Sequence, residues 1–139
     1  RLGDGQVIYI ASGFEAVYEE TEMPILRTSF GKLFEPYLAA RRAYEIEYQP
    51  GLTPHLMVSK ETILLHLLAD TGNKNKHLRP REGFLPLTDV KVRLRVPRAP
   101  KSVSLLRTGQ KLAVNNREGY IETTVPRVLI HEAVRVDLA

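Results

Sequence analysis

The segment Asp89-Val-Lys-Val-Arg-Leu-Arg-Val-Pro-Arg-Ala-Pro-Lys101 alternates apolar and basic side chains before it reaches two prolines. Successive side chains of a β-strand point to opposite faces, so an alternating segment has one apolar face and one polar face. The apolar face here consists of Val90, Val92, Leu94 and Val96. Burying these side chains gains about 1.5 to 3 kcal/mol each, more than an exposed basic stripe gains from an acidic partner. The segment is therefore predicted to be a strand whose valines and leucine face a core.

The same period of two recurs from residue 43 to the end of the chain. Apolar or alternating runs predict strands at residues 43–48, 56–58, 62–69, 89–96, 102–107, 111–114, 120–125 and 128–138. Turn-forming residues separate the runs, as at Pro50-Gly51, residues 115–119 and Pro126. Short strands at intervals of about ten residues are typical of an antiparallel β-sandwich or barrel.

Residues 1–42 have a different pattern, which predicts a strand followed by a helix. Residues 7–11, Val-Ile-Tyr-Ile-Ala, form a short apolar run typical of a strand buried on both faces. A helix is predicted over residues 23–35, because Pro24 suits a first helical turn and Pro36 disfavours helix in the residue before it. The change of period places the predicted domain boundary at residue 43.

The composition limits the class of protein. With 139 residues, 43% hydrophobic and 26% charged, the chain resembles soluble globular proteins, and no apolar run approaches the roughly 18 residues of a membrane-spanning helix. The absence of cysteine excludes disulfides and thiol nucleophiles, and it suits a reducing compartment, so a cytoplasmic location is favoured. The chain starts without an initiator methionine or a signal-peptide layout, which we interpret as an internal piece of a larger protein.

The net charge of +4 is unevenly distributed along the chain. Residues 1–40 contain 3 basic and 6 acidic side chains, whereas residues 41–139 contain 17 and 10. Nucleic-acid binding would require aromatic side chains among the basic ones, and Lys91, Arg93 and Arg95 have none on their face. Nucleic acid is therefore not expected as a partner. The basic face is predicted to contact solvent or an acidic neighbour, for which residues 1–40 are a candidate.

No combination of residues indicates catalysis, a metal or a cofactor. None of the histidines forms a pair at the spacings typical of metal ligands: His55, His66, His77 and His131. His66 interrupts an apolar strand and is interpreted as a hydrogen-bonded sheet residue. The clustered acids are interpreted as solvated surface, not as paired catalytic carboxylates: Glu15, Glu19, Glu20 and Glu22. Because a Gly-x-Ser-x-Gly elbow and a phosphate-binding loop are also absent, we assign no catalytic, metal-binding or cofactor-binding residue.

The longest predicted loop is the polar and basic segment of residues 70–83. Such loops run over the surface and often carry binding residues. The candidate ligand-binding residues of the chain are therefore placed here: Asp70, Asn73 and His77.

The order of segments resembles the C-terminal end of multidomain glycoside hydrolases of the β-galactosidase-like and α-L-fucosidase-like kinds. The matching segments are residues 7–10, the helix that starts at Pro24, and residues 62–72, 85–97, 103–107 and 120–126. In that family a catalytic (β/α)8 barrel is followed by an α/β domain resembling class I glutamine amidotransferases, often used for trimerisation, and then by a small antiparallel sandwich. The resemblance implies that residues 1–42 are the last strand and helix of the α/β domain, and residues 43–139 the terminal sandwich.

The resulting fold class is mainly β: an antiparallel β-sandwich preceded by a short strand–helix remnant of an α/β domain. Because the catalytic carboxylates of the family lie in the barrel, the resemblance implies a non-catalytic accessory region with a structural role in domain packing or assembly. The expected partners are other domains of the parent enzyme, or a second copy of the chain. One alternative is a carbohydrate-binding sandwich, although the chain lacks tryptophan and its candidate tyrosines lie in predicted strands: Tyr44, Tyr48 and Tyr120. The other alternative is a basic module that binds a polyanion.

Overall fold

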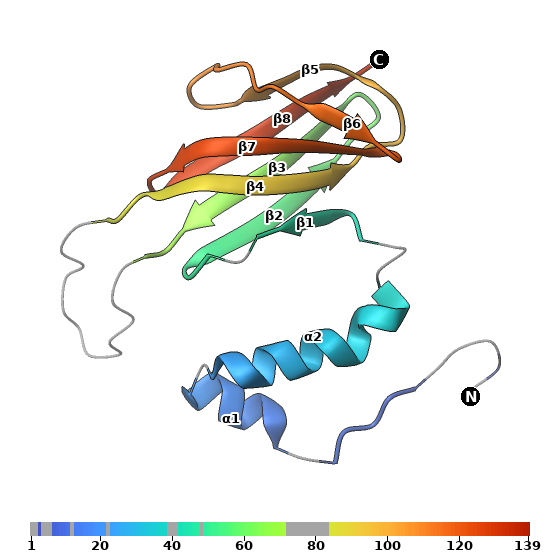
Figure 1. Ribbon diagram of the computed structural model, residues 1–139, viewed down its shortest axis with the longest axis vertical. Coiled ribbons are helices and arrows are strands. Elements are labelled where there is room, and N and C mark those ends of the chain that lie inside the picture. The colour runs from blue at the N-terminus through green and yellow to red at the C-terminus, as the bar shows by residue number, and fades with distance from the viewer. Residues whose placement is uncertain are drawn as a thin grey trace. The chain divides into compact units, whose positions relative to one another are not determined.

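A computed structural model shows two compact units, Arg1–Arg42 and Ala43–Ala139, each described here by itself. The structure describes Gly3 and residues 7–11, 13–21, 23–38, 42–47, 49–71 and 84–139. Among these residues, the first unit contains two helices and the second contains eight strands, so the chain is mainly β, as predicted (Figure 1).

The helices of the first unit are α1 (Phe14–Thr21) and α2 (Pro24–Leu38). Helix α2 begins at Pro24, as predicted, but it continues past Glu35 and contains Pro36. The prediction of its end was wrong because Pro36 removes only one backbone hydrogen bond, and close to the end of a helix the remaining bonds hold the last turn. Helix α1 was not predicted, since its glutamates were interpreted only as a surface.

The strand predicted at residues 7–11 is not formed. This segment has no strand assignment, and Val7 and Tyr9 are 71% and 86% exposed. A strand is stabilised by hydrogen bonds to a neighbouring strand, and the strand pairings of the described residues include none with this segment. An apolar run alone was therefore an insufficient signal.

The second unit is a sandwich of two four-stranded antiparallel sheets (Figure 1). One sheet has the order β1-β4-β7-β6, with β1 (Tyr44–Ile46), β4 (Leu87–Arg95), β7 (Tyr120–Val128) and β6 (Asn115–Arg117). The other has the order β2-β3-β8-β5, with β2 (Leu52–Val58), β3 (Thr62–Ala69), β8 (His131–Leu138) and β5 (Pro100–Leu105). We refer to them as the first and the second sheet.

The core of the sandwich follows from the period of two in its central strands. Strand β4 buries Val90, Val92 and Leu94, and Val96 just after it is also buried, as the opening alternation predicted. The neighbouring strand β7 and the strands of the other sheet contribute further residues that are at most 2% exposed: Ile63, Leu65, Leu67, Ile121, Val125, Val134 and Val136. These side chains form one hydrophobic cluster with residues from both sheets. The prediction of a sandwich is confirmed.

Several details of the strands differ from the predictions: β2 begins at Leu52 and not at residue 56, and β8 begins at His131 and not at residue 128. Residues 111–114 make only an isolated bridge from Lys111 to Ser104, while the predicted turn at residues 115–119 contains the short strand β6. Pro126 lies inside β7 and does not separate two strands. Strand β6 pairs with β7 only as far as Glu122, so beyond that point one edge of β7 lacks a partner among the described strands, and such an edge tolerates proline.

Candidate functional site

Asp70 is the one predicted ligand-binding residue that the structure describes, and it lies directly after β3. Its backbone amide donates a hydrogen bond to the carbonyl of Gly51, 2.7 Å away. Gly51 has a φ of 80°, and a Cβ atom placed on it would lie 2.4 Å from the carbonyl oxygen of Asp70. The backbone of Asp70 therefore helps to hold the start of β2 against the end of β3. Asn73 and His77 lie outside the described residues, so their predicted role stays a prediction.

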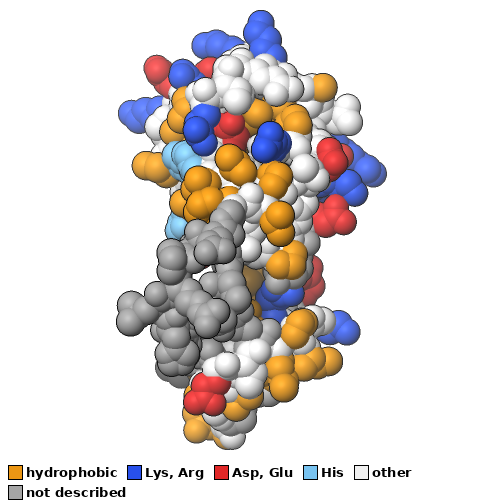
Figure 2. Space-filling model, turned by 90° about the vertical axis from the view of Figure 1, so that its left-hand side faces the viewer, with side chains coloured by type: hydrophobic (Ala, Val, Ile, Leu, Met, Phe, Trp, Pro, Cys, Tyr) orange, Lys and Arg blue, Asp and Glu red, His pale blue; other side chains and the backbone are white. Residues whose placement is uncertain are grey.

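Segments near Asp70 form an apolar surface at one end of the sandwich. The amide of Ala69 donates to the carbonyl of Ile130 at 2.8 Å, and the Thr71 hydroxyl donates to the carbonyl of Leu85 at 2.8 Å. These bonds bring together exposed side chains that we call the apolar end: Leu68, Phe84, Leu85, Leu129 and Ile130. Hydrophobic side chains gather on the face seen in Figure 2. Exposed apolar patches of this kind are typical of interaction surfaces.

A histidine pair lies on the outer face of the second sheet. His66 on β3 and His131 on β8 place Nδ1 of the first ring 3.0 Å from Nε2 of the second. The rings are 15° from parallel with centres 5.3 Å apart, so they meet edge to edge through these two nitrogens. His66 is a hydrogen-bonded sheet residue, as predicted. Its partner was missed, because 65 residues separate the two histidines.

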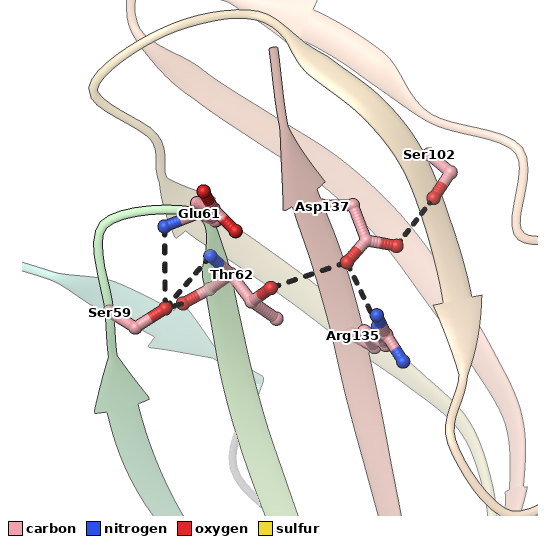
Figure 3. Close-up of polar contacts among 6 residues, drawn as sticks. All are labelled: Ser59, Glu61, Thr62, Ser102, Arg135 and Asp137. Carbon is pink, nitrogen blue, oxygen red and sulfur yellow. Dashed lines mark hydrogen bonds and ion pairs between the residues drawn. The ribbon is translucent and has the colours of Figure 1, made fainter.

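A second polar cluster on the outer face surrounds Asp137 (Figure 3). The Ser102 hydroxyl donates to Oδ2 at 2.9 Å, while Arg135 Nε and the Thr62 hydroxyl donate to Oδ1 at 2.9 and 3.3 Å. The hydrogen bond from Ser102, followed by that from Arg135, lowers the pKa of Asp137. An ionised carboxylate that accepts three hydrogen bonds connects β3, β8 and β5, and it is poorly suited to act as a base.

The Ser59 hydroxyl closes the β2–β3 hairpin beside this cluster (Figure 3). It accepts the amide hydrogens of Glu61 and Thr62 at 3.4 and 3.0 Å, and it donates to the carbonyl of Thr62 at 3.0 Å. These local bonds fix the hairpin turn and thereby the start of β3, which places the Thr62 hydroxyl next to Asp137.

The basic stripe of β4 finds its acidic partners within the sandwich. Arg93 Nη1 contacts both carboxylate oxygens of Glu45 at 3.2 and 3.3 Å, and its Nε lies 3.5 Å from Oε1 of Glu122. Lys91 Nζ forms an ion pair with Glu47 at 3.0 Å. The partners therefore come from the second unit, and the suggested role of residues 1–40 is not needed for Lys91 or Arg93. This pairing weakens the alternative of a polyanion-binding module.

The tyrosines considered for sugar stacking are also involved in the sandwich itself. The guanidinium carbon of Arg93 lies 4.1 Å from the ring centre of Tyr120. The prediction that the basic side chains have no aromatic one on their face was therefore wrong, because Tyr120 comes from the neighbouring strand β7. Tyr44 packs against the hydrophobic cluster. Tyr48 lies outside the described residues. Sugar binding by these strands would therefore require Tyr120 to exchange its cation–π contact for the sugar ring.

Within the described part of the chain, no group of three or more histidine, cysteine, aspartate or glutamate side chains could hold a metal ion. Neither described helix has the length and apolar character needed to cross a membrane.

Comparison with known proteins gives matches at the level of the fold. No protein-family model matches the sequence. No curated protein matches it either. Among solved structures, the chain is similar to α-L-fucosidase isoenzyme 2 from Paenibacillus thiaminolyticus, with a TM-score of 0.81 and 21% identity over 94% of this chain. It is also similar to a cycloisomaltooligosaccharide glucanotransferase of Paenibacillus sp., with a TM-score of 0.56 and 14% identity over 67% of this chain.

These likenesses show a fold that also occurs in glycoside hydrolase-type proteins. The chain spans 20% of the fucosidase chain and 16% of the glucanotransferase chain. The α-L-fucosidase resemblance predicted from the order of segments therefore has a structural counterpart. The predicted position at the C-terminal end of a parent enzyme stays a prediction.

Proposed function

We propose that this chain is a non-catalytic accessory region of a larger carbohydrate-active glycoside hydrolase, where it packs against other domains of the parent enzyme. The observation that carries the proposal is the likeness to the α-L-fucosidase, which extends over 94% of this chain but only 20% of the fucosidase chain. A region that forms so small a share of such a protein leaves room for a separate catalytic domain.

The chemistry of the sandwich surface supports a structural role. Asp137 accepts hydrogen bonds that connect three strands, and Arg93 connects β1, β4 and β7 through Glu45 and Glu122. Both groups are engaged within the fold, whereas a catalytic acid or base needs a proton-exchanging group directed at a substrate.

The apolar end supplies the surface for packing. Leu85 is 74% exposed and Ile130 is 46% exposed, and both belong to loops at one end of the sandwich. Domain interfaces within a chain bury such side chains, and their burial is favourable at about 25 cal/mol per Å² of apolar surface. In the proposed function, a neighbouring domain of the parent enzyme covers the apolar end.

The arrangement of domains is part of the same proposal. Residues 1–42 would be the end of a preceding amidotransferase-like domain, and residues 43–139 the terminal sandwich. Because the fucosidase likeness covers 94% of the chain, it includes most of both units, which supports this assignment.

An activity assay tests the non-catalytic part of the proposal. The purified chain should release no chromophore above the buffer rate from aryl α-L-fucosides and aryl β-galactosides. An intact α-L-fucosidase serves as the positive control. Measurable, saturable turnover by the purified chain would mean that the proposal is wrong.

A further inference from the structure

The geometry points to a metal-binding site at the histidine pair: His66 Nδ1 and His131 Nε2 together chelate a divalent d-block cation such as Zn²⁺ or Cu²⁺. The two nitrogens lie 3.0 Å apart. Two imidazole nitrogens bound to one Zn²⁺, each at about 2.0–2.1 Å, are separated by about 3 to 3.4 Å. Each ring must turn about its side-chain torsions, so that its lone pair points at the ion and no longer at the other ring.

The two histidines are held on a rigid support. Strands β3 and β8 are the two central strands of the second sheet, and their ladder runs from Thr62↔Asp137 to Leu68↔His131. Arg107 Nη1 donates to the backbone carbonyl of His131 at 3.0 Å, which further fixes this position. A chelating pair on a rigid sheet loses little conformational entropy when an ion binds.

The pair is suited to metal binding at neutral pH. In the hydrogen-bonded state one facing nitrogen carries a proton and the other accepts it. When the donor ring moves its proton to its outer nitrogen through solvent, both rings stay neutral and both facing nitrogens present lone pairs. A cation can then bind to the two facing nitrogens while each ring keeps one proton on its outer nitrogen.

The site would be an open one. No third histidine, aspartate or glutamate of the described residues completes a metal-binding group, so water or an external ligand must occupy the remaining positions. His55 lies opposite His66 in the register of β2 and β3 and is exposed. It shares the sheet face and the residue type of the pair, which makes it the matched control.

The experiment is a titration of the tag-free, EDTA-treated chain with ZnCl₂ at pH 7.5, followed by calorimetry and by ¹⁵N NMR of the imidazole nitrogens. We expect saturable binding, with the largest shifts at Nδ1 of His66 and Nε2 of His131, and a higher thermal midpoint with Zn²⁺. His66→Gln and His131→Gln should each weaken binding at least about tenfold, whereas His55→Gln should stay within about twofold.

Three results would overturn the assignment: no saturable binding by the wild-type chain, wild-type affinity in both His66→Gln and His131→Gln, or a loss of binding in His55→Gln as large as in His66→Gln. The NMR measurement uses the unmodified chain, so it decides the question even if a variant fails to fold. If Zn²⁺ shifts only the imidazole nitrogens of other histidines in the wild-type chain, the assignment of the site to His66 and His131 is wrong.

Discussion

At the scale of single residues, Gly51 is the position where the fold depends most directly on one residue type. Its φ of 80° is unfavourable for any side chain, and the carbonyl of Asp70 occupies the space of a Cβ. Gly109 has a similar φ of 69° but open space around it. An added side chain would therefore meet both backbone strain and steric overlap at Gly51, but only backbone strain at Gly109.

We predict that Gly51→Ala lowers the free energy of unfolding by about 2 kcal/mol or more, because strain and overlap both act there. Gly109→Ala should be less costly, because only strain acts. Urea unfolding of both variants measures the difference. Equal losses in the two variants would show that the close approach of Asp70 to Gly51 is not important for stability.

Asp137 makes a pH-dependent contribution at the same scale. Its pKa is lowered in the folded state, so the carboxylate stabilises the fold above the unfolded pKa of about 3.9, and this contribution is lost as the pH falls through the folded pKa. Asp137→Asn should therefore lower stability by about 1 kcal/mol at pH 7, and by less at pH 3, which is below the unfolded pKa.

Urea unfolding of the wild-type chain and of Asp137→Asn at both pH values checks this prediction. Glu61→Gln, which removes an exposed carboxylate in the nearby hairpin, is the control and should change little at either pH. If the loss in Asp137→Asn is the same at pH 3 as at pH 7, ionisation of Asp137 is not what stabilises the three strands.

At the scale of elements, β4 shows how far the sequence predicts the sandwich. Its alternation identified the buried residues, because a period of two on a half-buried strand leaves only one register that covers the apolar face. The apolar run at residues 62–69 likewise identified β3. Reasoning from such patterns failed at residues 7–11 and at β6, where strand formation depends on whether a partner strand is present, which no local pattern encodes.

The site residues were less predictable than the strands. The histidine pair joins residues 66 and 131, and the Asp137 cluster joins residues 62, 102 and 137. Their contacts exist only once β3, β8 and β5 are ordered side by side. The alternation of side chains along each strand does place His66 and His131 on the outward face. It does not show that the two residues are neighbours, because that depends on the order of the strands in the sheet.

Strand β4 also gives a direct test of the alternation. Leu94→Ala should lower the free energy of unfolding by about 2 to 5 kcal/mol, because Leu94 is fully buried between the sheets. Lys91→Ala on the opposite face should change it by no more than about 1 kcal/mol, since its ion pair with Glu47 is exposed. Unfolding by urea compares the two variants. A larger loss for Lys91→Ala would reverse the assignment of the two faces.

At the scale of the whole molecule, basic side chains of β4 are paired with acidic side chains of the same unit. The basic excess of residues 41–139 includes Lys91 and Arg93, which meet Glu45, Glu47 and Glu122 on neighbouring strands or beside them. The sandwich thus balances much of its own basic stripe. Its apolar end, in contrast, has exposed side chains of the kind found at interaction surfaces.

The central claim is that this chain belongs to a larger glycoside hydrolase whose catalytic residues lie elsewhere. The measurement that tests it most directly is the nucleotide sequence of the gene on the 5′ side of the codon for Arg1. We predict that the reading frame continues upstream and encodes a (β/α)8 barrel with two carboxylates at the ends of its strands. An in-frame stop codon directly upstream, or an upstream region that encodes no catalytic domain, would contradict the account.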